Sequence, residues 1–308
     1  MRTARLETLD GNPVLRFERR LAHSPEKVWR AVSDPGEMAH WFPALIEAEP
    51  HAGARMRFSF PGEEEVSAGE VLEFDPPKVY AFRWNTDVLR FEILPEEKGC
   101  VLVFTHVLGQ HAGFTAGRSA AGWDICLAAL ADRLDGREAE PVDHRPIMAF
   151  YLTKWNLAGA EMSRLDDGFR IRCRLDLVWR PIEQVWSTLC AGEHAEPGQT
   201  PPEWFTVAPT HPGSVFEVNP PHELAYRWPH EGDSAGEVRW QLVHDPELAT
   251  YVELTQTLPS ARARELPAIR AAWQIHLERL FATLLGVEQE STTERLQDLL
   301  LRYEQESR

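Results

Sequence analysis

The residues that could perform chemistry are few, and their spacing fits none of the common catalytic or metal sites. His106 and His111 lie five positions apart, across the end of a predicted strand and a glycine, and this spacing is not one that brings two ligands to a metal ion. The chain contains no Gly-x-Ser-x-Gly, no phosphate-binding loop and no dinucleotide-binding glycine run. Strand alternation aims no two carboxylates at one cavity, as an acid–base pair would require. We therefore expect no catalytic residue, no metal and no cofactor.

Polar residues on the predicted strands are better indicators of a site, because burial makes them costly unless they are paired. Alternation puts His106 on the same face as Phe104, so His106 is expected to point inward, either into a pocket or as a hydrogen-bonded histidine of the core or surface. Arg83 should lie on the opposite face. Its expected partner is Glu73 on the adjoining strand, and Arg227 should pair with Glu217 in the same way.

Aromatic residues of the first half are the predicted lining of an apolar pocket. A sheet curved around one helix cannot be filled evenly by side chains, so a concave apolar space with a few polar groups is expected. Each buried aromatic ring stabilises the fold by roughly 2–3 kcal/mol, and simple packing in the core is the alternative role for each of them. Together with one histidine, the predicted lining is Phe42, Phe58, Phe82, Trp84, Phe91, Phe104, His106 and Trp123.

One stretch of the chain occurs twice and indicates how these residues are positioned. The fourteen residues 71–84 reappear as 215–228, with seven identities. Both copies alternate apolar and polar residues, reverse at Asp/Asn-Pro-Pro and alternate again into Arg-Trp, which predicts two antiparallel strands joined by a tight turn. The proline pair should keep that turn extended rather than type I. A repeat offset of about 145 residues in a chain of 308 indicates two domains.

The first half should fold as a strand, two short helices, a run of antiparallel strands and one long helix. Ser24 before Pro25, and Asp34 before Pro35 with Glu37 beyond it, are predicted helix N-caps. The predicted strands are 13–21, 45–50, 54–60, 65–74, 78–85, 87–94 and 99–108, and the long helix is 119–134. A further helix should begin at Pro146 and reach about residue 160.

The second half repeats this order with one deletion. Its strands are expected at 169–178, 236–243 and 249–258, around the repeated hairpin, and Trp273 heads its long helix. The counterpart of the hairpin 55–66 is missing, so the second sheet should be smaller by about two strands. Ser291 with Glu294 should cap a final amphipathic helix, which either docks on its own chain or contacts a partner.

Composition narrows the class of protein. The net charge of −16 is spread along the chain, which argues against nucleic acid and anionic membranes as partners, since both attract basic patches. Four cysteines without close pairing are expected to be buried reduced thiols of a cytoplasmic protein. No signal peptide and no apolar run long enough to span a membrane are present in these 308 residues.

Five motifs in order carry a resemblance to a known family. They are Ser-Pro-Glu-Lys-Val-Trp at 24–29, Asp34-Pro35 leading to Trp41-Phe42, Gly-Glu-Val-Leu-Glu-Phe-Asp-Pro-Pro at 69–77, Phe-Arg-Trp at 82–84 and Gly-Trp at 122–123. This combination resembles the SRPBCC superfamily, in the branch related to the C-terminal domain of the activator of Hsp90 ATPase. The resemblance covers most of residues 14–136 and, more weakly, 169–286. It implies a helix-grip fold with an apolar cavity. The family includes lipid and hormone carriers and aromatase/cyclases, and shares no catalytic motif.

We therefore predict an α+β fold of two tandem helix-grip domains, each a curved antiparallel β-sheet around a long C-terminal α-helix, with a shorter sheet in the second copy. The expected boundaries are 1–136 for the first domain, 137–168 for a connector with a helix, 169–288 for the reduced second domain and 289–308 for the terminal helix. The cavity of the second copy should be open or collapsed.

Three functions are compatible with this architecture. The leading hypothesis is binding of a small apolar or amphipathic molecule in the first domain. One alternative is a chaperone-associated regulator of the Hsp90 type, with a chaperone or a second copy bound through residues 291–308. The other is a cyclase/aromatase-like enzyme, which would need a polar pair about 3 Å apart in the cavity. The sequence indicates no such pair.

Overall fold

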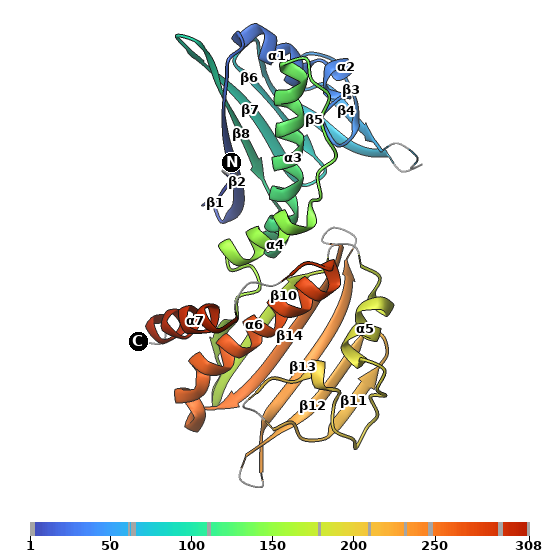
Figure 1. Cartoon of the computed structure of the whole chain (residues 1–308), viewed down its shortest axis with the longest axis vertical. Helices are drawn as coiled ribbons and strands as arrows, with labels where there is room; N and C mark the ends of the chain where they lie inside the picture. Colours follow the sequence, from blue (N-terminus) through green and yellow to red (C-terminus); the bar gives the residue numbers. More distant parts are fainter. Residues whose placement is uncertain are drawn as a thin grey trace. The chain divides into compact units, whose positions relative to one another are not determined.

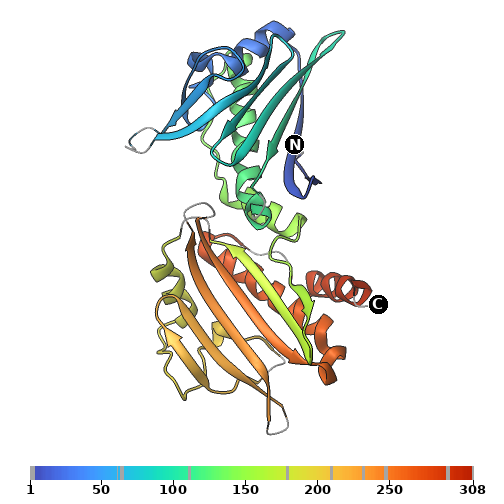
Figure 2. The same cartoon turned by 180° about the vertical axis from the view of Figure 1, so that it is seen from behind.

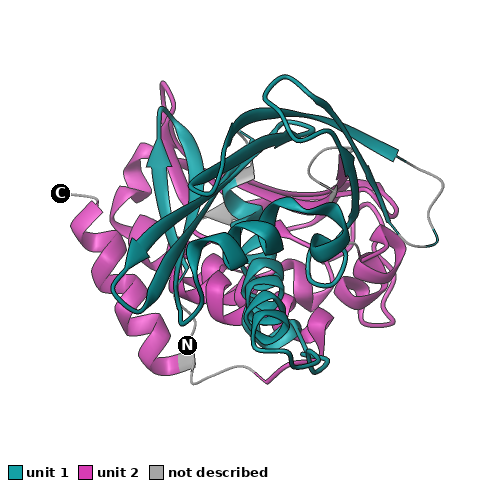
Figure 3. Ribbon diagram, turned by 90° about the horizontal axis from the view of Figure 1, so that it is seen from above, with its two compact units in different colours: residues 1–148 teal, residues 149–308 magenta. Residues whose placement is uncertain are grey.

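The computed structural model describes residues 4–60, 62, 66–109, 112–177, 180–208, 211–230, 233–245, 249–288 and 292–306. The chain divides into two compact units, Met1–Met148 and Ala149–Arg308 (Figure 3). This division falls inside the segment 137–168 that we expected to connect two domains. Helix α4 (Arg145–Lys154) runs across it.

Unit 1 holds a curved antiparallel sheet with one long helix across its face (Figure 1). In the described residues this sheet has eight strands in the order β1-β2-β8-β7-β6-β5-β4-β3. The strands are β1 (Arg5–Leu9), β2 (Asn12–Leu21), β3 (Leu45–Ala48), β4 (Arg55–Ser59), β5 (Val66–Asp75), β6 (Val79–Trp84), β7 (Asp87–Glu96) and β8 (Gly99–Val107). The seven strands predicted for this half are all present.

The short helices begin where the sequence predicts. In α1 (Pro25–Ser33) the Ser24 side chain accepts a hydrogen bond from the backbone N–H of Lys27, and in α2 (Pro35–Met38) the Asp34 side chain accepts one from that of Glu37. Each cap satisfies an N–H that the first helical turn leaves without a partner. The Glu37 side chain does not complete a capping box. It instead accepts hydrogen bonds from Arg30 and Arg133.

The long helix α3 (Ala116–Leu134) buries one stripe of side chains against the sheet. Trp123, Leu127, Leu130 and Leu134 lie on that stripe, as their helical spacing predicts. Asp124 adds an ion pair of 2.8 Å to Arg19 of β2. The 3-10 helix η1 (Ala112–Thr115) precedes α3.

Strand β1 was not predicted. It pairs with β2 through a two-residue turn at Asp10 and Gly11, both of which have positive φ angles, of 49° and 83°. Asp-Gly is the sequence that such a turn favours, because both residues tolerate the left-handed conformation. The Asp-Gly pair thus indicated a turn, but the five residues of β1 are too few and too polar to show a clear strand pattern.

Unit 2 repeats the strand order of unit 1 with a smaller sheet. Among the described residues it has six strands in the order β11-β12-β13-β14-β10-β9. They are β9 (Glu161–Arg164), β10 (Gly168–Asp176), β11 (Val215–Asn219), β12 (Glu223–His230), β13 (Asp233–Asp245) and β14 (Ala249–Pro259). Aligned with unit 1, the order lacks counterparts of β3 and β4. This confirms the predicted loss of about two strands.

The helices of unit 2 complete the α+β architecture. They are α5 (Ile182–Cys190), the 3-10 helices η2 (Glu203–Phe205) and η3 (Ser260–Glu265), α6 (Leu266–Leu285) and α7 (Thr292–Glu306). The long helix α6 lies across one face of the sheet of unit 2, and Figure 2 shows the face of that sheet that α6 does not cover. In the part of the chain that the structure describes, no helix combines the length and the apolar character needed to cross a bilayer.

The repeated hairpin has the same irregularity in both units. A β-bulge shifts the register between Val71 and Glu73, and another between Val215 and Glu217. The turns contain cis peptide bonds, Pro76–Pro77 and Pro220–Pro221, where we expected an extended turn.

The predicted Arg83–Glu73 and Arg227–Glu217 pairs do not form among the described residues. Glu70 lies opposite Arg83, and Glu73 lies opposite Ala81. The next strand presents Arg90 to Glu73 and Arg239 to Glu217. Arg83 is exposed, on the side of the sheet where we expected it.

Helix α7 docks on its own unit through a buried polar network. Tyr303, 1% exposed, accepts a hydrogen bond from the Ala160 N–H at 2.8 Å and donates its hydroxyl hydrogen to Gln274 of α6. Arg295 donates to Glu278 at 2.7 Å, and Arg270 donates to Glu306 at 2.7 Å. The predicted cap Ser291 lies outside the described residues, and a partner contact through 291–308 stays a prediction.

We expect Tyr303→Phe to lower the free energy of unfolding of unit 2 by about 1–3 kcal/mol, because it leaves the buried Ala160 N–H without an acceptor. Leu301→Ala on the same helix is the control. That side chain is 58% exposed, so its removal should change stability by less than about 0.5 kcal/mol. Urea unfolding of the full chain measures both. Equal effects of the two substitutions would contradict the docking role of Tyr303.

Candidate functional site

The predicted pocket residues of unit 1 lie together in one aromatic cluster. Phe58, Phe82, Phe91 and Phe104 are fully buried on strands, while Phe42 and Trp123 are 6% and 5% exposed. Phe42 joins the sheet to the helix, since its ring centroid lies 5.6 Å from both Trp84 and Trp123. The structure thus brings all seven predicted aromatic residues into one connected set of ring contacts.

Trp84 differs from the rest of the cluster because it is partly exposed. Its ring stacks on Phe58 at 4.7 Å with 14° between the planes, and besides Phe42 it also neighbours Phe60 at 6.0 Å. The indole N–H donates to the Ser67 hydroxyl at 2.8 Å. Gly69, opposite Trp84 on β5, makes room for this stack, since a Cβ there would lie 2.7 Å from the Phe58 ring. Trp84 therefore marks the margin at which the aromatic cluster meets solvent.

His106 is buried at the same end of the sheet and joins strand to helix. Its Nδ1 atom accepts a hydrogen bond from the Trp123 indole N–H at 2.8 Å. Its Nε2 atom lies 2.8 Å from an Asp87 carboxylate oxygen, and the other oxygen of Asp87 accepts from the Gly109 N–H at 3.0 Å. His106 points inward, as strand alternation predicted.

The hydrogen bonds of His106 assign its tautomer. An indole N–H can only donate, so Nδ1 must be the accepting, unprotonated nitrogen, and Nε2 carries the proton that is donated to Asp87. Both ring nitrogens are thereby occupied. An imidazole held in this way cannot take a proton from a substrate without breaking one of its bonds. The Asp87–His106 pair therefore positions the long helix rather than acting as an acid–base pair.

Asp87 was missed by the sequence analysis, which foresaw no polar pair about 3 Å apart. It lies directly opposite Trp84 in the β6–β7 hairpin, whose two-residue turn Asn85-Thr86 begins with a positive φ of 53° at Asn85. Because Asn favours the positive φ of such a turn, Asn85 could have indicated the hairpin that places Asp87 opposite Trp84.

Unit 2 makes the corresponding bond with a different acceptor. The Trp273 indole N–H of α6 donates to Gln256 Oε1 of β14 at 2.5 Å, at the positions equivalent to Trp123 and His106. Gln256 is 1% exposed, and its amide nitrogen has no hydrogen-bond partner in the described residues. In both units, therefore, a tryptophan of the long helix donates its indole N–H to a strand of the sheet, although the accepting residue differs.

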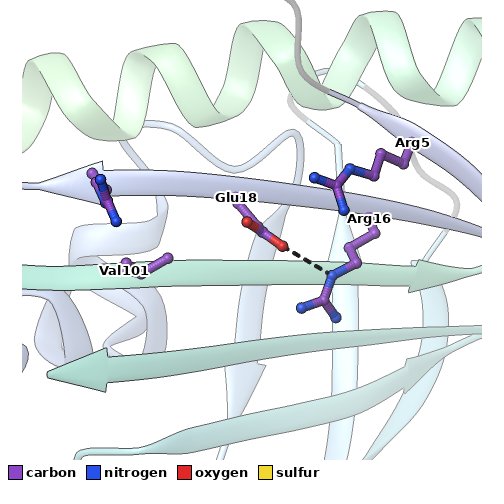
Figure 4. Close-up of a pocket in the computed structure, with 5 residues that line it drawn as sticks. Arg5, Arg16, Glu18 and Val101 are labelled. Atoms are coloured by element: carbon purple, nitrogen blue, oxygen red, sulfur yellow. Dashed lines mark hydrogen bonds and ion pairs between the residues drawn. The ribbon is translucent and has the colours of Figure 1, made fainter.

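A shallow basic hollow of about 310 Å³ lies away from this cluster, on strands β1, β2 and β8 (Figure 4). Arg5 and Arg16 lie opposite each other across β1 and β2, and Arg16 pairs with Glu18 at 3.3 Å. Arg20, 82% exposed at its side chain, pairs with Glu96 at 3.2 Å. These exposed pairs form a solvated face and bring no buried polar group to the hollow.

The cysteines are poor nucleophiles. All four are free, and three of them, Cys100, Cys173 and Cys190, are buried. Cys126 is only partly exposed, and its desolvation raises the pKa of its thiol to about 12; burial also raises the pKa of Cys100. A thiol with a raised pKa is protonated at neutral pH, and the thiolate is the reactive form.

Comparison with known proteins finds one family model that matches part of unit 1. Residues 22–135 match the model of the family described as Activator of Hsp90 ATPase homolog 1-like protein, which is of the SRPBCC type. The match begins just after β2 and ends just after α3, and the six-stranded sheet of unit 2 is consistent with a tandem copy. No curated protein matches the sequence.

Solved structures that resemble the chain include three bacterial proteins. EF2215 of Enterococcus faecalis, a conserved protein of unknown function, is 22% identical with a TM-score of 0.44, covering 50% of this chain and 90% of that one. CalU16 of Micromonospora echinospora is 18% identical with a TM-score of 0.41, covering 51% and 95%. MLL2253 of Mesorhizobium loti is 26% identical with a TM-score of 0.36, covering 40% and 97%.

We expect His106→Leu to destabilise unit 1 by about 2–4 kcal/mol, because it leaves the Trp123 N–H buried without an acceptor and the Asp87 carboxylate without its donor. His106→Gln should cost about 1 kcal/mol, because glutamine supplies the acceptor that Gln256 supplies in unit 2. Thermal or urea unfolding compares the two variants. If leucine is tolerated as well as glutamine, the indole bond does not hold the helix.

Proposed function

We propose that unit 1 binds a small apolar or amphipathic molecule at the margin of its aromatic cluster, beside Trp84. The observation that carries this proposal is the partial exposure of Trp84, stacked on Phe58 at the edge of rings that are otherwise buried. An aromatic ring in this position offers apolar surface that a bound molecule removes from water.

A polar group lies beside this apolar surface. Asp87, directly opposite Trp84 in the hairpin, has a side chain that is 32% exposed. Because paired residues of adjacent strands share a face of the sheet, an apolar body against Trp84 and Phe60 would leave its polar end near Asp87. This combination of a large apolar wall and one polar group is typical of small-molecule sites.

The equivalent position of unit 2 is closed. Trp228 is 2% exposed, and the Arg262 guanidinium lies 4.2 Å from its ring centroid. Trp240 and Trp273, both fully buried, pack with a centroid distance of 5.8 Å. The two units therefore differ at the tryptophan of the repeated hairpin, and this contrast supports the assignment of the site to unit 1.

We expect Trp84→Ala to weaken binding of the neutral fluorophore N-phenyl-1-naphthylamine about tenfold or more, because it removes roughly 1.5–3 kcal/mol of apolar contact. Trp228→Phe, a conservative change at the equivalent position of unit 2, should leave binding unchanged, since Trp228 is enclosed. Fluorescence titration measures both, with circular dichroism to verify folding. Equal losses in the two variants, or none in Trp84→Ala, would contradict the assignment.

A further inference from the structure

A groove of about 660 Å³ lies on unit 2, beside the long helix α6 and outside the tryptophan core. This volume is within the range of small-molecule sites, about 300–1,000 Å³. Its walls are the η2 segment with the residues after it and one side of α6, with a single residue of α7 at the rim. The lining residues that matter here are Glu203, Trp204, Ile275, His276 and Arg279.

Trp204 has left the core position that its counterpart occupies. In unit 1 the equivalent Trp41 is 4% exposed and donates its indole N–H to the Ala31 carbonyl at 2.9 Å. Trp204 is partly exposed, lines the groove, and its indole N–H donates to none of the described residues. Phe205 takes the buried place instead, fully enclosed beneath Trp240 at 5.5 Å. The same Trp-Phe pair thus offers an aromatic wall only in unit 2.

The face of α6 that lines the groove carries polar residues that the equivalent face of α3 lacks. Ala272, Ile275, His276 and Arg279 follow the i, i+3, i+4, i+7 spacing of one helical face, and all four line the groove. The equivalent residues of α3, 150 positions earlier, are Gly122, Ile125, Cys126 and Ala129. A histidine and an arginine therefore stand where the first copy has cysteine and alanine.

His276 is held neutral and oriented by the groove wall. Its Nε2 atom donates to the Trp204 carbonyl at 2.7 Å, which assigns Nδ1 as the unprotonated nitrogen. Burial lowers the pKa of His276 and the nearby Arg279 lowers it further, against the Trp204 carbonyl and Glu203, which raise it. Its Nδ1 atom bonds to none of the described residues.

Arg279 provides the positive charge of the groove. It is exposed, its guanidinium lies 5.6 Å from the Trp204 ring centroid, and no ion pair joins it to a carboxylate within the described ranges. A guanidinium matches the geometry of a carboxylate, which it binds through two parallel N–H donors. The net charge of the chain is −16, so most of its charged groups repel an anion. The groove is different, because it combines a cation with an aromatic wall.

We propose that this groove binds a small aromatic carboxylate, with its ring against Trp204 and Ile275 and its carboxylate on Arg279. The groove lies in unit 2 and is independent of the site at Trp84, so each can exist without the other.

Isothermal titration of the full chain with 2-naphthoate, and with the uncharged 2-naphthamide, tests this proposal. We expect 2-naphthoate to bind with a dissociation constant of about 1 mM or below and the amide to bind about tenfold more weakly, because one charge-assisted interaction is lost. Arg279→Gln and Trp204→Leu should each weaken 2-naphthoate about tenfold or more. Arg264→Gln, an exposed arginine of η3 outside the groove, is the matched control and should have no effect.

The proposal is overturned if the unaltered chain does not bind 2-naphthoate at about 5 mM, if acid and amide bind equally, or if Arg279→Gln has no greater effect than Arg264→Gln. Trp84→Ala separates the two sites. Loss of 2-naphthoate binding in Trp84→Ala with retention in Arg279→Gln would place the acid in unit 1 and reject the groove. Loss in Arg279→Gln with retention in Trp84→Ala supports the groove whatever becomes of the site in unit 1.

Discussion

A buried indole N–H on the long helix requires an acceptor on the sheet, and both units of this chain meet that requirement at the same place. Leaving such a donor unsatisfied in the core would cost about 1–3 kcal/mol. Trp123 donates to His106, and Trp273 donates to Gln256. Because a hydrogen bond constrains both distance and direction, it fixes the helix against its strand where apolar contacts alone would permit sliding.

The two copies differ in what surrounds that shared bond. In unit 1, the acceptor His106 is itself held by Asp87, the first residue of β7, opposite the partly exposed Trp84. Strand β4 supplies Phe58, on which Trp84 stacks. Unit 2 lacks counterparts of β3 and β4 in its described sheet, and large buried tryptophans fill its core. Its polar and aromatic surface lies instead along α6, at Trp204, His276 and Arg279. The two units thus share the hydrogen bond between helix and sheet, but they differ in which aromatic and polar side chains are accessible.

Local signals predicted most of the fold. Proline-based helix starts at Ser24 and Asp34, strand alternation and the repeated hairpin each have a local physical cause, and the structure has the corresponding elements. Strand β1 was missed although Asp10-Gly11 marks its turn. The predicted pairing of Arg83 with Glu73 was wrong because Arg83 lies opposite Glu70, and strand alternation alone does not fix the register between β5 and β6.

The candidate sites were less predictable because they depend on contacts between distant elements. Alternation placed His106 inward, but its bonds to Asp87 and Trp123 join three elements that only the fold brings together. Trp41 and Trp204 occupy equivalent positions in the sequence, yet one is buried and the other lines a groove. That difference follows from packing around each residue, which the Trp-Phe pattern does not encode.

The most direct test of the contrast between the two units is indole NMR of the chain labelled with ¹⁵N-tryptophan, whose eleven tryptophans give separate N–H signals for assignment by substitution. On titration with N-phenyl-1-naphthylamine, the account predicts that the Trp84 signal shifts progressively to saturation while those of Trp228 and Trp273 stay in place. Movement of the Trp228 and Trp273 signals with a stationary Trp84 would contradict it.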